Sequence, residues 1–193
     1  MTEKQVAKEI EEYYRERTEG LAFDTIVASG ENTSKPHAVP GERKIQKNDI
    51  ITIDMGCRVE GYCSDMTRTF FVGNIPEEAK KVYDLVLKNQ IQTQEEFKDG
   101  ASTRQLTKMV ENDFKLNGYS LIHSLGHGVG LEIHEPPFIN YKTDFTLKEN
   151  MVITNEPGIY IPGKFGVRIE DTVQITKFGC MNLTKSEKNY III

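Results

Sequence analysis

The feature that most constrains this 193-residue chain is a weak internal repeat. When the sequence is shifted by 100 residues, the segment Thr2-Glu-Lys-Gln-Val6 falls on Ser102-Thr-Arg-Gln-Leu106. Both segments carry the Ser/Thr-x-x-Gln pattern of a capping box, which predicts helices over residues 2–17 and 102–116. Each half then ends in two strand-like runs with acidic residues near the turn. A helix–strand–hairpin unit used twice explains these features better than a chance match between two amphipathic helices.

Hydrophobic periodicity predicts the remaining elements. Apolar residues at three- and four-residue steps predict a long helix from Pro76 to Lys98, ended by Asp99-Gly100. Strands are expected at residues 22–28, 50–56, 66–72, 119–124, 151–154 and 167–176. We expect one α+β domain over residues 1–193, with a first half at about 1–75 and a second half at about 76–193.

Composition excludes several classes of protein. Lys and Arg number 24 against 29 Asp and Glu, a net charge of −5 without a basic tract, so we expect no nucleic-acid partner. No apolar run approaches the roughly 18–20 residues of a membrane-spanning helix, so no membrane partner is expected either. The three cysteines form no CxxC pair and no hydrophobic signal region follows Met1. Reduced thiols and a cytoplasmic location are therefore expected.

Carboxylates occur where strands should be apolar. Asp54 ends a run rich in β-branched residues, although aspartate is depleted in strands and rarely buried unpaired. Asp54 and Asp65 are symmetric about the first expected turn, so in a regular hairpin they would lie opposite each other. Glu156 and Glu170 are likewise symmetric about Gly163. Asp54 alone could simply face solvent, but four carboxylates that converge need cations between them, which predicts an oxygen-rich cation site.

Three of the four histidines, His123, His127 and His134, fall within twelve positions of a glycine-rich stretch. His123 and His127 have the spacing of a helical zinc pair, but the glycines at 126, 128 and 130 argue against a helix. The chain shows no HExxH, phosphate-loop or Gly-x-Ser-x-Gly motif. One imidazole and four carboxylates suit two divalent ions about 3.5–4 Å apart that activate a bridging water for hydrolysis. The mixed oxygen and nitrogen ligands favour Mn, Fe, Co or Zn over calcium.

At these residues the chain resembles the pita-bread metallopeptidases, the family of Xaa-Pro dipeptidase (prolidase), aminopeptidase P and methionine aminopeptidase. The resemblance runs from Ala22 to about Glu187 and rests on five motifs in order: Ile-Asp54-Met-Gly, Ser-Asp65-Met-Thr-Arg, Gly-His127-Gly-Val-Gly, Asn-Glu156-Pro-Gly and Arg-Ile-Glu170-Asp. It implies an α+β pita-bread fold, with two pseudo-symmetric halves around a curved antiparallel sheet. It also implies two divalent ions, with Mn preferred over Co, Fe or Zn. Asp54 would chelate one ion, His127 with Glu156 would hold the other, and Asp65 with Glu170 would bridge them.

Further motifs resemble the proline-specific branch, chiefly His37 in Lys-Pro-His-Ala-Val-Pro and Arg168 two residues before a ligand. This resemblance implies hydrolysis of the bond between an N-terminal residue and proline, in dipeptides or longer peptides. Glu156 would shuttle the proton, while His134 and His37 would donate to the developing oxyanion or to the residue after the cut. Arg168 would orient a carboxylate. His123 would not bind the ions itself but would help to hold the side chains that do. We place His37, His134, Arg168 and His123 together at the substrate site.

Two other interpretations remain: a truncated, non-catalytic peptide-binding pita-bread module, and a methionine aminopeptidase. Asn150 and Asn155 depart from the family, which often has glycine and an apolar residue at these positions. Members of the branch also carry an N-terminal domain and a long helix before the segment that matches Thr2, and we expect this chain to lack both. By the symmetry of the halves, the surface under that helix would be exposed. We therefore expect a homodimer or a poorly soluble monomer, with weak activity.

Overall fold

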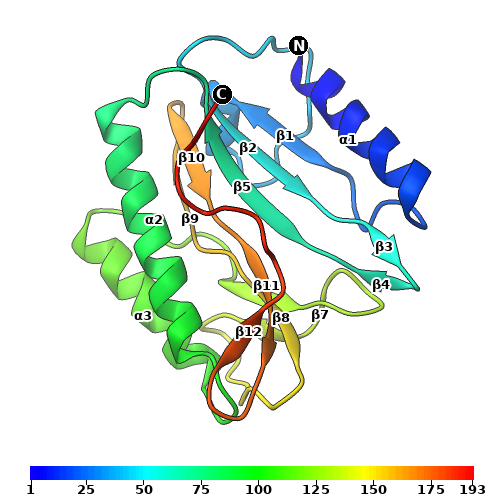
Figure 1. Cartoon of the computed structure of the whole chain (residues 1–193). Helices are drawn as coiled ribbons and strands as arrows, with labels where there is room; N and C mark the ends of the chain where they lie inside the picture. The colour runs from blue at the N-terminus through cyan, green and yellow to red at the C-terminus, as the bar shows by residue number, and fades with distance from the viewer.

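A computed structural model describes all residues 1–193 as an α+β fold with curved sheets between outer helices (Figure 1). The elements follow in the order α1 (Glu3–Arg17), β1 (Ile26–Ser29), η1 (Gly30–Ser34), β2 (Ile50–Met55), β3 (Arg58–Val59), β4 (Tyr62–Cys63), β5 (Met66–Phe71), α2 (Glu77–Glu96), α3 (Thr103–Leu116), β6 (Gly126–Gly128), β7 (Glu135–Ile139), β8 (Val152–Asn155), β9 (Gly158–Ile161), β10 (Phe165–Arg168), β11 (Asp171–Ile175), β12 (Cys180–Asn182) and β13 (Ile191–Ile192).

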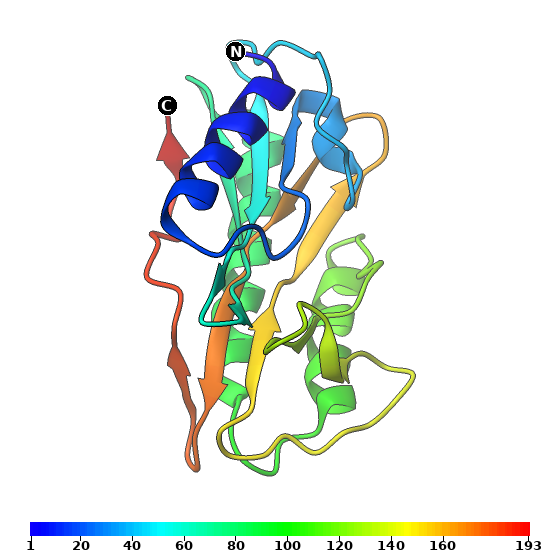
Figure 2. The same ribbon diagram turned by 90° about the vertical axis from the view of Figure 1, so that its right-hand side faces the viewer.

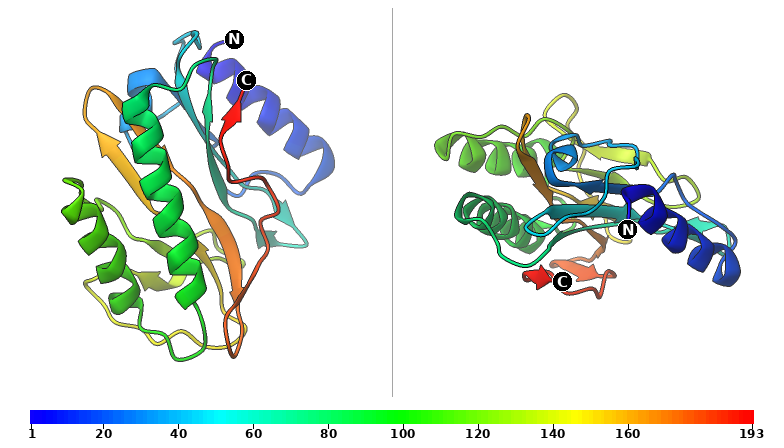
Figure 3. Two further views of the ribbon diagram at one scale, coloured as in Figure 1. Left: turned by 60° about the vertical axis from the view of Figure 1, so that its left-hand side comes forward. Right: turned by 90° about the horizontal axis from the view of Figure 1, so that it is seen from above.

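Two main sheets carry the two halves. The first has the strand order β1-β2-β5-β13, and the second has the order β12-β11-β8-β6-β7. Their neighbours pair antiparallel, except that β13 pairs parallel with β5 and so returns the C-terminus to the first half. Helix α1 lies against the first sheet on one side of the molecule, whereas α2 and α3 lie on the other side (Figures 1 and 3). None of the helices is long and apolar enough to cross a membrane.

The expected symmetry is present at the starts of α1 and α3. Thr2 caps α1 through a complete capping box with Gln5, as the sequence predicted. Ser102 caps α3 through the Gln105 amide at 3.2 Å, but the reciprocal half of that box is not formed. Both capping residues also form an isolated antiparallel bridge, Thr2 with Lys44 and Ser102 with Thr146. The repeat in the sequence is therefore a repeat in the backbone.

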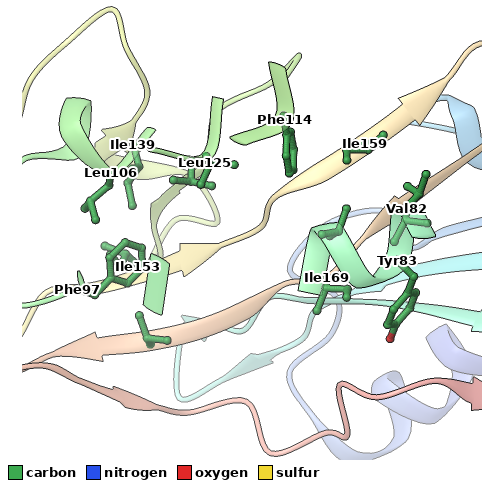
Figure 4. Close-up of a cluster of buried hydrophobic side chains, with 14 of the residues drawn as sticks. Val82, Tyr83, Phe97, Leu106, Phe114, Leu125, Ile139, Ile153, Ile159 and Ile169 are labelled. Carbon is green, nitrogen blue, oxygen red and sulfur yellow. The ribbon is translucent and has the colours of Figure 1, made fainter. Parts of the chain in front are cut away.

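The main core lies between helices α2 and α3 and the strands of the second half, and Ile50 and Phe71 of the first half join it (Figure 4). Ala79, Val82 and Val86 of the expected α2 stripe are buried, whereas Ile91 is 42% exposed. Helix α1 buries Ala7 on a smaller cluster with β1 and β2, and Val6 and Ile10 are only half-buried there. Figure 2 shows α1 lying across the strands of the first half. The expected assembly through this face stays a prediction.

Three strand predictions need correction. Residues 119–124 form an irregular segment that pairs with no other strand. Ile122 within this segment is 59% exposed. The strand expected at 22–28 is shorter and shifted, since pairing with β2 begins only at Ile26. The run expected at 167–176 is two strands, β10 and β11, interrupted at Ile169 and Glu170. That interruption matters because it lies at the site described next.

Candidate active site

The first hairpin brings Asp54 to the middle of the first sheet. Asp54 on β2 pairs with Ile26 on β1 and with Thr67 on β5. The expectation that Asp54 would lie opposite Asp65 is therefore wrong. The turn is centred one residue later than expected, because Val59 pairs with Tyr62 across it. Asp65 instead precedes β5 and reaches the same space from the end of that strand.

The second hairpin has the register that the sequence predicted. Gly158 pairs with Arg168 in one ladder, and Asn155 pairs with Asp171 in the next. Glu156 and Glu170 lie between these two ladders, so each carboxylate stands at a break in its strand and opposite the other. Because of these breaks, the two side chains do not follow the regular alternation of side chains between the faces of the sheet.

Thr67 is one of the residues that join the two hairpins. The Glu170 amide donates to the Thr67 carbonyl at 3.1 Å, and the Thr67 hydroxyl donates to Glu170 Oε2 at 2.6 Å. Because Thr67 also pairs with Asp54, carboxylates from both halves are fixed relative to each other. The sequence analysis did not single out Thr67, and its place in the Asp65-Met-Thr motif was the only available signal.

All nine site residues predicted from the sequence line one cavity of about 500 Å³. Its walls also include apolar side chains and an adjacent serine. The lining comprises Phe23, Asp24, Ile26, Pro36, His37, Asp54, Asp65, His123, Ser124, His127, Ile133, His134, Phe138, Glu156, Arg168 and Glu170. A cavity of this size suits a small ligand.

The floor of the cavity has the geometry of a cation site. Ligand atoms of Asp65, His127 and Glu170 all lie within 4.8 Å of one another. His127 Nε2 lies 3.4 Å from Asp65 Oδ2 and 3.3 Å from Glu156 Oε1, while its Nδ1 lies 3.0 Å from the Gly128 carbonyl. A backbone acceptor at Nδ1 leaves Nε2 to face the carboxylates, which is the usual arrangement of a metal-binding histidine.

Asp54 provides a separate test of the fit. Its Oδ2 accepts a hydrogen bond from Arg168 Nη2 at 2.6 Å, but its Oδ1 is buried without any hydrogen-bond partner. An orphaned carboxylate oxygen inside a protein is costly unless a cation or proton occupies its free side. The residues present therefore fit a divalent metal site.

The raised pKa values of the carboxyl groups agree with a divalent metal site. Burial raises the pKa of Asp65 to about 6, with the negative charge of Asp54 adding to the effect. Burial likewise raises the pKa of Glu156 to about 7. The pKa of Glu170 is raised well above its ordinary value by burial and by the neighbouring carboxylates. Without a cation, these carboxyl groups stay protonated to a higher pH than usual, because like-charge repulsion and desolvation both disfavour the charged form.

Behind the carboxylates, a polar chain fixes one histidine. Arg168 Nη1 donates to the Tyr160 hydroxyl at 2.7 Å, and that hydroxyl lies 3.0 Å from His123 Nε2. Since the hydroxyl accepts from Arg168, its own proton points to Nε2, and His123 Nδ1 donates to the Ser124 carbonyl at 2.7 Å. Burial and the charge of Arg168 lower the pKa of His123 to about 4, so this imidazole is neutral at pH 7. Sequence reasoning missed Tyr160.

The two remaining histidines lie nearer the mouth. The rings of His127 and His134 are 4.4 Å apart between centroids. Burial lowers the pKa of His134, and the charges of His127 and His37 lower it further. His37 is exposed on the segment after η1 and lines the cavity beside Pro36. Neither His134 nor His37 hydrogen-bonds a protein group, so their ring nitrogens are free to meet a ligand.

These features define a class of protein: the chain belongs to metallopeptidase family M24, whose model matches residues 1–177. The chain is 45% identical over 192 residues to an Xaa-Pro dipeptidase of Pyrococcus furiosus, which covers 98% of this chain and 55% of that protein. An X-Pro aminopeptidase structure from Thermotoga maritima superposes with a TM-score of 0.97 at 40% identity, covering 100% of this chain and 56% of that one. An aminopeptidase P variant from Escherichia coli gives 0.86 at 28% identity, covering 96% and 49%.

The expected pita-bread fold and family resemblance are thus confirmed. The chain spans about half the length of the curated relatives it matches.

Proposed function

We propose that this chain forms the catalytic part of a metal-dependent exopeptidase that cleaves between an N-terminal residue and proline. The convergence of Asp54, Asp65, His127, Glu156 and Glu170 on the floor of one cavity carries the proposal. The relatives named for Xaa-Pro peptide bonds support the substrate class.

Two divalent ions complete the proposed site, with Mn preferred over Co, Fe or Zn. We assign Asp54 to one ion, His127 and Glu156 to the other, and Asp65 and Glu170 to both. When bound, such ions polarise a carbonyl and supply a strong nucleophile near neutral pH. The buried, unpartnered Oδ1 of Asp54 and the Nε2 of His127, which faces the carboxylates of Asp65 and Glu156, support these assignments.

Glu156 is the proposed proton carrier. In the metal-free site, burial raises the pKa of Glu156 to about 7, so its carboxyl group takes up a proton near neutral pH. The Thr154 hydroxyl donates to Glu156 Oε1 at 3.1 Å and so orients the carboxylate. His127 Nε2 lies 3.3 Å from the same oxygen, which places proton carrier and proposed ligand together.

The histidines at the mouth are proposed to bind the peptide. His134 and His37 line the cavity with uncommitted ring nitrogens, suited to donate to the oxyanion or to a terminal carboxylate. Arg168 is proposed to act through Asp54, which it holds at 2.6 Å, and His123 through Tyr160. The apolar rim at Phe138 is suited to contact a proline ring or the preceding side chain.

The direct test is cleavage of Ala-Pro and Ala-Pro-Ala with added Mn²⁺, against Ala-Ala and Met-Ala. Faster cleavage of the proline peptides supports the proposal, and the length of the better substrate separates dipeptidase from aminopeptidase. Equal rates on Ala-Ala and Ala-Pro contradict the proline assignment. Release of methionine from Met-Ala would indicate a methionine aminopeptidase, and metal binding without cleavage would indicate a binding module. The cytoplasmic location stays a prediction.

A further inference from the structure

Glu3 is a fully buried carboxylate, 0% exposed, that no part of the proposed mechanism uses. It forms no salt bridge. Instead, Oε1 accepts from the Ser29 amide at 2.6 Å, the Ser29 hydroxyl at 2.7 Å and the Asn32 side-chain amide at 3.1 Å. Oε2 accepts from the Gly41 amide at 3.0 Å. Burying a carboxylate costs folding free energy, because a buried charge is tolerated only when it makes several hydrogen bonds.

The contacts of Glu3 join the two ends of a single loop. Ser29 ends β1, and Gly41 follows the second proline of the segment, so Glu3 holds both ends of residues 29–41. Asn32 lies inside the same loop, on the first turn of η1. We call residues 29–41 the His37 loop, because they carry the histidine at the mouth of the cavity.

The far side of the His37 loop contacts the proposed site. The Pro36 carbonyl accepts from Arg168 Nη1 at 3.1 Å, and the Thr33 hydroxyl accepts from the Gly166 amide at 2.8 Å. Pro36 and His37 both line the cavity. The loop is therefore held at its base by Glu3 and at its tip by β10 of the second half.

The internal repeat shows that Glu3 does more than start a helix. The symmetry-related position is Thr103, also 0% exposed, whose hydroxyl accepts only the Phe145 amide at 2.9 Å. The segment after β6 in the second half also lines the cavity, through His134, but the Thr103 hydroxyl does not hydrogen-bond to it. The N-terminus of α1 is already capped by Thr2. The carboxylate thus occurs only in the half whose cavity-lining loop is hydrogen-bonded to the start of the helix.

We propose that Glu3 is a positioning residue, which acts through the His37 loop to hold His37 and Pro36 against the peptide site. Loss of the carboxylate lets the loop open and lowers substrate affinity, while the metal ligands on β2, β5 and the second hairpin keep their places. The consequence for substrate rests on the proposed function, but the consequence for the loop does not.

The test is Glu3→Gln, with Glu9→Gln on the exposed face of α1 as the matched control. Glutamine keeps the size but turns one acceptor into a donor that faces amide donors. Hydrogen exchange of the full chain with Mn²⁺ should speed up about tenfold in residues 29–41, and not in α2, β8 or β11. KM for Ala-Pro should rise about tenfold, with kcat and Mn²⁺ affinity changed less than about twofold. Glu9→Gln should match the parent chain.

A double-variant cycle separates positioning from general stability. In a His37→Ala background, Glu3→Gln should raise KM by less than about twofold, because the group it positions is gone. Additive effects, or faster exchange spread over the whole first half with loss of metal, would overturn the proposal. Asn32→Ala removes one donor to Glu3 and serves if Glu3→Gln does not fold. If the parent chain cleaves no Xaa-Pro peptide, the proposed function fails, but exchange in the loop still decides the role of Glu3.

Discussion

Arg168 and Asp54 lie 2.6 Å apart, Nη2 to Oδ2, and so join the second hairpin to the first. Arg168 also donates to Thr67, Tyr160 and Pro36, so its guanidinium is held from four sides. This fixed fork occupies one oxygen of Asp54 and leaves the other, Oδ1, buried and free. A carboxylate that is oriented in this way presents a single oxygen to a cation, which is the geometry a metal ligand needs.

Replacing Arg168 by lysine should therefore be severe although the charge is kept. Lysine cannot reproduce a planar fork that serves several acceptors. We expect kcat/KM for Ala-Pro to fall by about 10–100-fold, the usual cost of changing a residue that orients a metal ligand. Lys164→Ala, at the tip of the same hairpin in an exposed pair with Glu78, should leave it unchanged. An Arg168→Lys variant with parental activity would show that Asp54 needs no orienting group.

Removal of a proposed bridging ligand should be visible without any substrate. Glu170→Gln replaces a charged oxygen by a neutral amide at the point where both ions are proposed to meet. We expect Mn²⁺ bound per chain to fall from two to one or none, measured by equilibrium dialysis with metal analysis. Glu149→Gln, an exposed residue on a loop, is the control. Two tightly bound ions in Glu170→Gln would contradict the bridging role.

The metal-free chain should lose stability as pH rises from about 6.5 to 8. Glu156, with its pKa raised to about 7, and Glu170, with its pKa raised well above its ordinary value, hold protons in the folded state that the unfolded chain has released. The folded state therefore binds more protons in this window, and its stability falls as those protons leave. His123, with its pKa lowered to about 4, acts in the opposite direction at the lower end of this window, and its effect fades above about pH 7.5 as the unfolded imidazole loses its proton.

The measurement is the melting temperature at pH 6.5 and 8, with EDTA and then with Mn²⁺. With EDTA we expect a drop of several degrees, and Glu156→Gln should reduce that drop. With Mn²⁺ the trend should reverse, because metal binding needs deprotonated ligands and strengthens as pH rises. A melting temperature in EDTA that is flat or rises with pH would contradict the raised pKa values.

Local signals made much of this structure predictable. Helices α1, α2 and α3 begin within one residue of the expected positions, because capping and periodicity are short-range properties. Asn150, which stands where the family often has glycine, has φ of 71°. The first hairpin register was misjudged because Glu60 and Gly61 both adopt positive φ, 51° and 79°, which centres a two-residue turn between them.

The residues of the candidate site were predictable only where they stand in a recognisable sequence motif. The five proposed ligands and Arg168 stand in such motifs, and all of them line the cavity. The supporting contacts were not predictable, because they join residues far apart in the chain. Thr67 with Glu170 and Glu3 with Gly41 are examples that no local pattern reveals. The tautomer of His123 likewise depends on Tyr160, whose hydroxyl the fold brings to it from β9.

The buried ion pair of Arg68 and Asp171 should matter more for stability than any surface pair. Arg68 Nη2 lies 2.7 Å from Asp171 Oδ1, and the side chains are 1% and 0% exposed. Arg68 also donates to the carbonyls of Ser186 and Glu187, so it ties the C-terminal segment to β5 and β11. Asp171→Asn leaves the guanidinium buried without its counter-ion, which costs about 3–5 kcal/mol. The melting temperature should fall by roughly 10 °C or more.

The matched control is Glu111→Gln, which breaks the partly exposed pair with Lys115 on α3 and should cost less than about 0.5 kcal/mol. Because Arg68 Nη1 also donates to the Glu170 carbonyl, Asp171→Asn should weaken Mn²⁺ binding as well as the fold. Hydrogen exchange should then increase first in residues 183–193, since this segment loses its anchor before the sheets open. Equal melting temperatures for Asp171→Asn and Glu111→Gln would mean that the backbone carbonyls that accept from Arg68 suffice to stabilise its buried charge.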